Sequence, residues 1–292
     1  MQNLNDNFIF GCWRLNEWNY STHELRRLVD QLLDIGINEF DHADIYGNYS
    51  CEAIFGKLLA EDPSLRKKIK LTSKCGIKLI SDKFPEHKSH IYDTSKAHIT
   101  AATERSIQNL QSGYLDLLLI HRPDPLMNAD EVAEAFMLLK ASGKVLNFGV
   151  SNFTPMQFEL LQSRLDFPLI TNQIEASVVC HEHFVNQNLD FCQKIKMRPQ
   201  VWSPLAGGRL SDQTNSTSLR VWRTLENIAS KYESTPEIIA IAWLLTHPAK
   251  LRILLGSGKI ERITQLLNAQ EIDLNRDEWF ALWSAYTGVE IP

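Results

Sequence analysis

The sequence predicts an α/β protein, a (β/α)8 or TIM barrel, that forms one domain over residues 1–292 with long loops at the carboxyl ends of its strands. Short apolar runs alternate with segments of helical pattern eight times along the chain. The run "LDLLLIH" at 115–121 is almost entirely apolar, as expected for a parallel strand that is buried on both faces. The first apolar run leads into "FGCWRLNEW", which lacks the Gly-x-Gly-x-x-Gly pattern of an open, doubly wound sheet.

Eight strands are expected where short apolar runs end in polar or turn-forming residues. In chain order they are 9–13, 38–41, 69–74, 115–121, 145–151, 169–173, 200–203 and 252–256. Barrels of this kind contain about 250 residues in one domain, so a length of 292 residues fits. No repeat, linker or clear boundary interrupts the pattern.

The segments between the strands carry signals for the ends of helices. "STHE" at 21–24 predicts a capping box, and that helix should end near Gly36. Asn128 precedes an acidic first turn, and its helix should end by Gly143. Two further helices are predicted where threonine precedes proline, at 154–155 and 235–236.

Two long polar segments interrupt this regular alternation. Residues 78–94 follow the third expected strand, and residues 205–218 follow the seventh. On a barrel, both segments would overhang the face at which the strands end.

Composition excludes several classes of function. With 44% hydrophobic and 22% charged residues, the chain has an ordinary globular composition. A net charge of -5 argues against a surface for nucleic acid or an anionic membrane. No apolar stretch approaches the roughly 18 residues of a membrane span, and "MQNLNDNFIF" does not resemble a signal peptide. Five cysteines without a CxxC pair are typical of reduced thiols, so we expect a cytoplasmic protein.

Polar side chains gather at the carboxyl ends of the expected strands. The second strand ends in Asp41 with Tyr46 shortly after it, the third ends in Lys74, and the fourth ends in His121. The later strands end in Ser151-Asn152, Asn172-Gln173, Trp202-Ser203 and "GSGKIER". In a barrel these ends meet at one rim, where active sites are built.

The first four of these residues suit proton transfer. A tyrosine with a pKa near 10 is a poor acid at neutral pH, but a nearby ammonium lowers the pKa of the phenol. A buried lysine needs a carboxylate to stay charged, and a histidine can orient an oxygen or pass protons. Asp41, Tyr46, Lys74 and His121 therefore predict a relay around one proton donor, suited to protonating an oxyanion as a carbonyl is reduced.

From Phe8 to about Asn268 the chain resembles the aldo-keto reductase family. The matching motifs are "FDHADIYGNYSCEAIFGKLL", "LTSKCG", "YLDLLLIHRPDP", "GKVLNFGVSNFTP", "TNQIE", "WSPLAGG" and "LLGSGKIERI". More narrowly, "WRLNEW", "DHADIYG" and "HRPDPLMNADEVAEAF" resemble the bacterial YdhF-type oxidoreductases of that family. The resemblance implies a catalytic tetrad of the four residues above, Tyr46 as general acid, and reduction of a small aldehyde or ketone with NADPH.

The resemblance also implies a set of cofactor-binding residues. Ser151, Asn152 and Gln173 match the residues that hold the nicotinamide carboxamide, and Trp202 replaces the tyrosine that often stacks on the ring. The other matching positions are Ser203, Leu205, Gly207, Gly256, Ser257, Gly258, Lys259, Arg262 and Gln265. Basic residues in the last segment contact the 2′-phosphate in the family, so NADPH is favoured over NADH, although one often basic position is Gly256 here.

Several other polar residues are expected to be structural. His42 and Asp44 alternate with Asp41, and Cys75 follows Lys74, so their side chains should turn away from the site. The "HEH" at 181–183 lacks the further ligands of a zinc site, so no metal is expected.

Trp13 and Trp18 are expected at the rim, lining an apolar substrate pocket.

The alternative to an enzyme is a sensor or regulatory subunit that binds the nicotinamide cofactor with little turnover, and a metal-dependent hydrolase is a more distant one. The sequence predicts neither the physiological substrate nor the oligomeric state.

Overall fold

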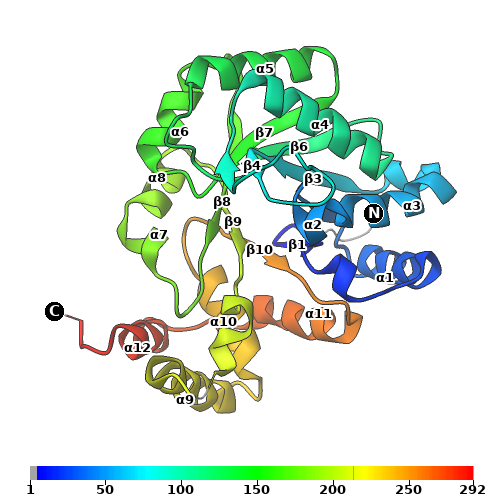
Figure 1. Ribbon diagram of the computed structural model, residues 1–292. Helices are drawn as coiled ribbons and strands as arrows, with labels where there is room; N and C mark the ends of the chain where they lie inside the picture. The colour runs from blue at the N-terminus through cyan, green and yellow to red at the C-terminus, as the bar shows by residue number, and fades with distance from the viewer. Residues whose placement is uncertain (1–4, 213, 292) are drawn as a thin grey trace. The chain divides into compact units, whose positions relative to one another are not determined.

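The computed structural model describes residues 5–212 and 214–291. Its main strands are β1 Phe8–Gly11, β2 Glu39–Asp41, β3 Lys70–Cys75, β6 Leu115–Ile120, β7 Val145–Ser151, β8 Leu169–Glu175, β9 Gln200–Trp202 and β10 Arg252–Leu255. These eight strands form a closed barrel in the order β1-β10-β9-β8-β7-β6-β3-β2 (Figure 1). The predicted (β/α)8 fold is therefore confirmed.

Helices connect successive strands of the barrel. The α-helices are α1 Thr22–Asp34, α2 Tyr46–Tyr49, α3 Cys51–Glu61, α4 Lys96–Leu110, α5 Ala129–Ala141, α6 Pro155–Gln162, α7 Glu182–Val185, α8 Asn188–Lys194, α9 Ser216–Lys231, α10 Pro236–Leu245, α11 Ile260–Leu267 and α12 Arg276–Thr287. The short 3-10 helices are η1 Leu15–Glu17, η2 Pro63–Lys67, η3 Ala206–Ser211 and η4 Asn268–Glu271. The capping box at Ser21 and the caps at Asn128, Thr154 and Thr235 are present as predicted.

The chain consists of two compact units. The first contains the residues up to 173 together with 256–258, and the second contains the remaining residues. The prediction of one domain over residues 1–292 stays a prediction.

The first unit packs an aromatic core between its strands and helices. Phe40 lies between Phe10 and Phe55, with ring centroids 5.7 Å and 5.3 Å away, and Phe136 stacks on Phe148 at 4.3 Å. Figure 1 shows α4 and α5 side by side, and α4 packs against β3 while α5 packs against β7. The parallel register pairs Asp41 with Thr72 and Ser151 with Gln173, so the ends of β2, β7 and β8 carry the predicted site residues.

The second unit has a core of stacked aromatic rings. Trp243 and Trp279 stack at 4.7 Å, and each indole N–H donates to the backbone carbonyl of the other tryptophan. His181 stacks on Trp283 at 4.3 Å. His183 accepts a hydrogen bond from Asn188 at 3.1 Å. Both histidines of the "HEH" segment therefore have structural contacts within this unit.

Several strands end one or two residues earlier than the sequence predicts. β1 ends at Gly11, β6 at Ile120 and β9 at Trp202, so Trp13, His121 and Ser203 lie on the turns that follow. β3 ends one residue later, at Cys75. The strands lie where predicted because apolar runs mark the buried part of each strand. Their last residues differ because the final ladder hydrogen bond depends on the neighbouring strand.

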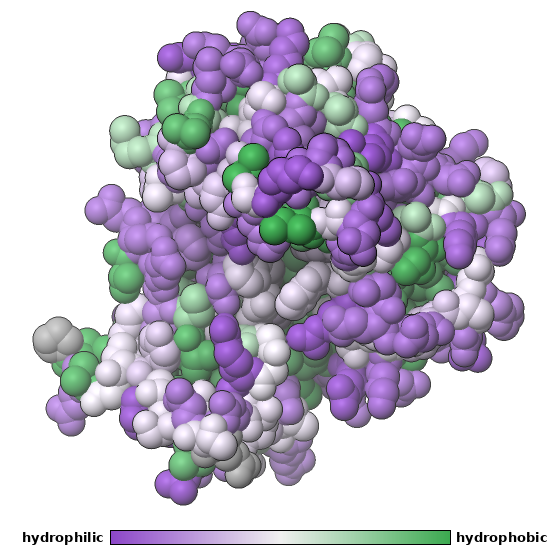
Figure 2. Space-filling model, viewed as in Figure 1, coloured by the Kyte–Doolittle hydropathy of each residue, from purple (hydrophilic) through white to green (hydrophobic). Residues whose placement is uncertain are grey.

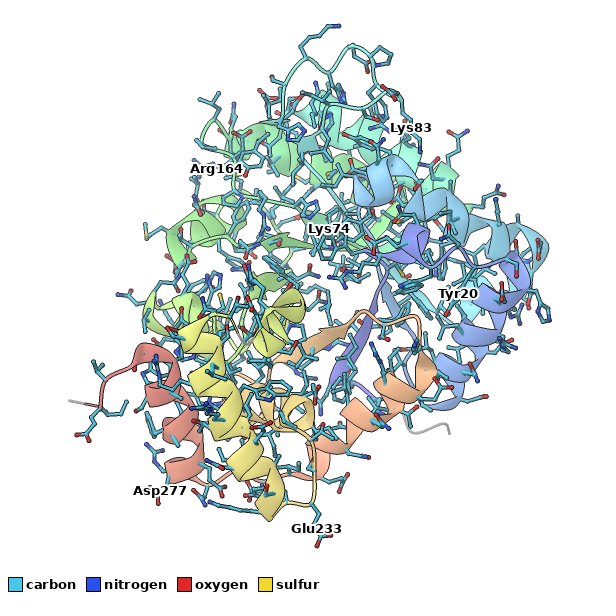
Figure 3. The ribbon with its side chains drawn as sticks, turned by 60° about the horizontal axis from the view of Figure 1, so that its bottom comes forward. Tyr20, Lys74, Lys83, Arg164, Glu233 and Asp277 are labelled. Carbon is cyan, nitrogen blue, oxygen red and sulfur yellow. The ribbon has the colours of Figure 1, made fainter. Side chains whose placement is uncertain are left out.

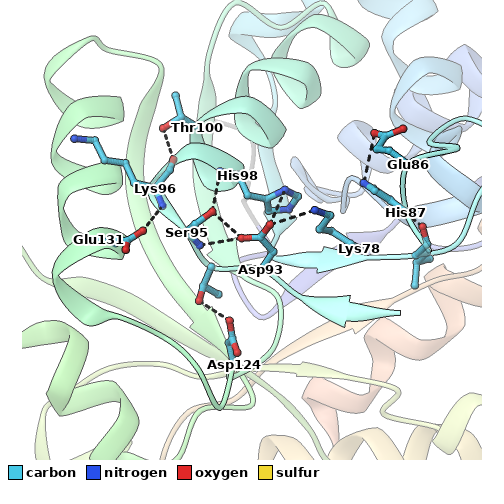
Figure 4. Close-up of polar contacts among 12 residues, drawn as sticks. Lys78, Glu86, His87, Asp93, Ser95, Lys96, His98, Thr100, Asp124 and Glu131 are labelled. Carbon is cyan, nitrogen blue, oxygen red and sulfur yellow. Dashed lines mark hydrogen bonds and ion pairs between the residues drawn. The ribbon is translucent and has the colours of Figure 1, made fainter. Parts of the chain in front are cut away.

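The predicted overhanging segment after β3 contains a small hairpin, β4 Ile77–Lys78 with β5 Ile91–Tyr92. Asp93 ties the end of this hairpin to α4, as Figure 4 shows: its carboxylate accepts from Ser95 at 2.7 Å and lies 3.3 Å from Lys78 Nζ. Thr94 donates to Asp124 at 2.8 Å. In the second predicted overhang, 205–218, η3 is formed, and residue 213 lies outside the described residues.

The surface shown in Figure 2 is mostly hydrophilic, and its apolar side chains form small separate patches. Across the described residues, no helix is both long enough and apolar enough to cross a membrane.

We expect Arg66 to be a major contributor to the stability of the first unit. Its guanidinium donates to the carbonyls of Ile69, Ser112 and Tyr114 and pairs with Asp116 at 2.8 Å, and its side chain is only 9% exposed. The change Arg66→Met removes the ion-pair partner of the partly buried Asp116 carboxylate and leaves the carbonyls of Ile69, Ser112 and Tyr114 without this donor, so the free energy of unfolding should fall by about 3 kcal/mol.

Chemical denaturation of the variant and the parent would measure this loss. Arg26→Met is the matched control, since Arg26 pairs with Asp62 with both side chains about one-third exposed, and it should cost less than about 1 kcal/mol. Equal losses in the two variants would contradict a special role for Arg66.

Candidate active site

Lys74 is the centre of the candidate site. Its side chain is 1% exposed, and Nζ donates to Asp41 Oδ2 at 2.6 Å, to the His42 carbonyl at 2.8 Å and to the Tyr46 hydroxyl at 2.9 Å. An ammonium has three N–H groups, so all of them are used. Figure 3 shows Lys74 deep among the side chains of the strands, unlike the exposed Lys83. The structure thus brings together three of the four predicted catalytic residues.

The chain reaches this geometry through an unusual turn after β2. Tyr46 is followed by Gly47, Asn48 and Tyr49, whose φ angles are 58°, 52° and 60°. Left-handed backbone is unfavourable for residues with a side chain, and such strain is common beside functional sites. A Cβ at Gly47 would lie 2.7 Å from Cys51 Sγ, so glycine is also required there for space. The turn leaves Tyr46 half-buried above the Lys74 ammonium.

Two opposing effects act on the pKa of Tyr46. Burial raises the pKa of Tyr46, and the nearby Lys74 ammonium lowers it by less, so the net shift is upward. The lowering expected from a nearby ammonium is present, but desolvation of the phenolate, which the sequence does not reveal, outweighs it. Tyr46 is a neutral phenol at neutral pH and holds the proton that it would donate.

Lys74 is charged and His121 is neutral. Burial alone would lower the pKa of Lys74, but Asp41 and Tyr46 outweigh it, so the pKa is raised and the ammonium persists. Burial and the Lys74 charge hold the pKa of His121 well below its usual value, so the imidazole is neutral. The His121 ring lies edge-on to Tyr46, with centroids 5.9 Å apart, and is 8% exposed.

Ser151, Asn152 and Gln173 form a second polar cluster in the first unit. Ser151 Oγ donates to the Gln173 carbonyl at 2.8 Å and accepts from Asn152 Nδ2 at 3.0 Å. Asn152 has a φ of 56°, which turns its side chain back toward Ser151. Gln173 Nε2 donates to Asp41 Oδ1 at 2.8 Å. This last bond joins the predicted carboxamide-binding residues directly to the predicted catalytic residues.

The glycine-rich segment 256–258 packs on residues that follow β1. A Cβ at Gly258 would lie 2.9 Å from the Trp18 ring, and the Tyr20 hydroxyl donates to the Gly258 carbonyl at 2.6 Å. Trp18 therefore supports this segment, in addition to the expected role at the rim. Tyr20 was missed by sequence reasoning, since nothing in its local pattern indicates a partner 238 residues away.

The remaining cofactor-binding candidates belong to the second unit. Trp202, Ser203 and Leu205 are half-buried, and Gly207 is exposed with a φ of 64°. Lys259, Arg262 and Gln265 are exposed at the start and along the length of α11.

The residues expected to be structural are buried. The His42 ring packs edge-on to Phe55 at 4.8 Å, burial lowers its pKa to about 3, and its backbone carbonyl serves Lys74. Burial also raises the pKa of Asp44 and Cys75 well above their usual values, so the Cys75 thiol is uncharged at neutral pH. Among the described residues, no group of His, Cys, Asp or Glu side chains could hold a metal ion.

One protein family and two bacterial oxidoreductases match nearly the whole chain. The profile described as the aldo/keto reductase family matches residues 7–286. The chain is 48% identical to the uncharacterized oxidoreductase YcsN of Bacillus subtilis, covering 97% of this chain and 95% of that protein. It is 44% identical to oxidoreductase YdhF of Escherichia coli, covering 98% and 95%.

A more distant relative and a solved structure agree with these matches. The chain is 38% identical to a 6-dehydroglucose reductase of Agrobacterium fabrum, covering 97% of this chain and 95% of that protein. Its fold matches a thermostable aldo-keto reductase, Tm1743, solved with the inhibitor epalrestat, with a TM-score of 0.79, 26% identity and coverage of 96% and 94%. The resemblance seen in the motifs, including the YdhF-type branch, is therefore confirmed.

The pairing of Asp41 with Lys74 predicts a specific pattern of stability. Asp41→Asn leaves a buried ammonium without its counter-ion, so unfolding should become easier by about 3–5 kcal/mol. The double variant Asp41→Asn with Lys74→Met should recover most of this loss, because no unpaired charge remains, but it should not recover activity. Denaturation of the four proteins in this cycle measures the coupling, and additive losses would show that the two residues do not pair.

Proposed function

The chain belongs to the aldo/keto reductase family and is an oxidoreductase, and we propose that it reduces a small-molecule aldehyde or ketone with NADPH, with Tyr46 as the general acid. One observation carries this proposal: the Lys74 ammonium bonds both the Asp41 carboxylate at 2.6 Å and the Tyr46 hydroxyl at 2.9 Å. This arrangement supports a phenol that gives up its proton during a reaction and takes it back afterwards.

The residues of the proposed cofactor site fit a nicotinamide dinucleotide phosphate. Ser151, Asn152 and Gln173 supply hydroxyl and amide groups, which together offer the donors and acceptors that a carboxamide needs. Trp202 stands at the family position for the ring that stacks on the nicotinamide, and an indole supplies a flat apolar surface. The exposed Lys259 and Arg262 supply positive charge for a phosphate, and Arg is suited to that contact by its planar donor fork.

We propose the following roles for the chain's own residues. A bound nicotinamide cofactor would supply the hydride for the carbonyl carbon, and the carbonyl oxygen would need a proton to become the alcohol. Tyr46 donates that proton, and Lys74 stabilises the phenolate left behind. Asp41 holds Lys74 in place. Neutral His121, edge-on to Tyr46, orients the substrate oxygen without competing as a stronger acid.

The proposed substrate class is one that needs a proton donor of this kind. The proposed donor is a neutral phenol, which matches an oxygen that gains negative charge during reduction. One relative is named for the reduction of 6-dehydroglucose, so aldehyde sugars belong among the candidates beside simple aldehydes, ketones and quinones. The alternative, a cofactor-binding regulatory subunit with little turnover, is less well supported because all four residues of the proposed relay are present.

Steady-state oxidation of NADPH and NADH with this panel of carbonyl compounds tests the proposal. Turnover with a carbonyl substrate supports a reductase. Tight NADPH binding with no turnover on any member of the panel would favour the regulatory alternative.

We expect Tyr46→Phe to lose most reductase activity while keeping the ring and the fold. General acid catalysis contributes about 10²–10⁴-fold, which sets the expected fall in kcat. NADPH affinity, measured by fluorescence titration, should be nearly unchanged. Near-normal kcat in this variant would show that another group donates the proton.

Arg262→Ala should weaken the binding of NADPH more than that of NADH, because only NADPH carries the 2′-phosphate. Dissociation constants for both cofactors should diverge by about tenfold or more, as for the loss of a hydrogen-bonded charge pair. Arg223→Ala, which removes another exposed arginine of the second unit, on α9, is the matched control and should change neither constant. An equal effect of Arg262→Ala on both cofactors would point to packing instead.

A further inference from the structure

Both oxygens of the Asp41 carboxylate have a strong donor. Oδ2 accepts from Lys74 Nζ at 2.6 Å, and Oδ1 accepts from Gln173 Nε2 at 2.8 Å. Asp41 is 1% exposed and Gln173 is 2% exposed, so water does not take the place of either donor. A carboxylate that pairs with an ammonium can only accept hydrogen bonds, so the amide nitrogen of Gln173 must be the group that faces it.

The backbone of Gln173 is held independently of its side chain. Its carbonyl accepts from Ser151 Oγ at 2.8 Å and from the Asn152 backbone N–H at 3.0 Å. The register of β7 and β8 also places Gln173 opposite Ser151. The amide therefore projects from a fixed point of the barrel, which is the requirement for a group that positions another side chain.

We propose that Gln173 is a positioning residue for the general acid: it holds Asp41 Oδ1 so that Oδ2 stays on Lys74 and Lys74 stays on Tyr46. This inference rests on the proposed function, and it extends it. The same side chain matches the family's contact to the nicotinamide carboxamide, and its amide nitrogen has two N–H groups. The Gln173 amide would therefore both contact the cofactor and position Asp41.

Loss of the Gln173 donor would weaken Tyr46 as an acid through its effect on Asp41 and Lys74. Without Gln173, Oδ1 is a buried oxygen with no donor, and the carboxylate draws more strongly on the proton of Lys74. Lys74 then donates less to the oxygen of Tyr46, so the phenolate is less stabilised and Tyr46 becomes a weaker acid. The other titratable groups that face Tyr46 are Cys12 after β1 and His121 after β6, and both are neutral, so neither can replace the lost support.

Two variants of Gln173 separate positioning from simple cofactor contact. Gln173→Met removes the donor and keeps an unbranched chain. Gln173→Glu places a second carboxyl group against Asp41, and two adjacent carboxyl groups share a proton with one pKa strongly raised. Below that raised pKa the shared proton restores the hydrogen bond, and above it two negative charges face each other.

The first measurement uses protein without cofactor. NMR of isotope-labelled tyrosine follows the ionisation of Tyr46, with Tyr46→Phe identifying its signal. Gln173→Met should move the titration of Tyr46 to higher pH than in the parent. Thermal melts of both variants verify that they remain folded over the pH range used.

The second measurement is the pH profile of kcat at saturating NADPH. Gln173→Met should lower kcat by about 10–100-fold across the neutral range, as expected for a lost hydrogen bond to a charged group. Gln173→Glu should approach the parent at low pH, and its kcat should fall as pH rises through the pKa of the shared proton. Gln162→Met is the matched control: it makes the same change at a half-buried glutamine of α6, whose amide donates to the Phe167 carbonyl at 2.9 Å, so it should leave both NADPH affinity and the shape of the profile unchanged.

One combination of results would overturn the inference. If Gln173→Met weakens NADPH binding but leaves both kcat and the titration of Tyr46 unchanged, Gln173 is only a cofactor contact. If the parent shows no reductase activity at all, the proposed function fails, whereas the titration of Tyr46 in the cofactor-free protein still decides whether Gln173 controls this tyrosine.

Discussion

The buried ammonium of Lys74 is the constraint on which the organisation of the site depends. An ammonium removed from water is very costly unless every N–H finds an acceptor. Its acceptors are the Asp41 carboxylate, the His42 carbonyl and the Tyr46 hydroxyl, which come from the end of β2, the turn after it and the start of α2. The ends of β2 and β3 and the turn between β2 and α2 must therefore keep one arrangement for the charge to stay buried.

The same burial determines the charge of the neighbouring groups. His42, His121 and Cys12 are all held in their neutral forms, chiefly because burial disfavours their charged forms. The Asp41–Lys74 pair is consequently a single ionic contact surrounded by neutral groups. In such an environment a small change in the donors around the carboxylate acts on the tyrosine with little screening, since the buried Lys74 bonds directly to both Asp41 and Tyr46.

The backbone around the site is strained at several points. Asn48, Tyr49 and Asn152 have left-handed φ angles although they carry side chains. Tyr49 also anchors the segment after β3, because its hydroxyl accepts from the Leu79 N–H at 2.9 Å and its carbonyl accepts from Lys83 at 2.9 Å. The turn that presents Tyr46 is thus joined to a loop that overhangs the ends of the strands. Strain of this kind persists only where the surrounding contacts hold it.

Apolar periodicity and capping side chains act over a few neighbouring residues. For this reason the fold class, most strands and helix caps, and the residues at the strand ends could be predicted from the sequence. It also indicated that Asp41, Tyr46 and Lys74 belong together. The tertiary structure decided the rest. The His42 carbonyl as a ligand of Lys74, the bond from Gln173 to Asp41, and the support of Gly258 by Trp18 and Tyr20 all join residues that no local pattern relates. The upward shift of the Tyr46 pKa likewise depends on desolvation, which arises only when segments distant in sequence close around the phenol.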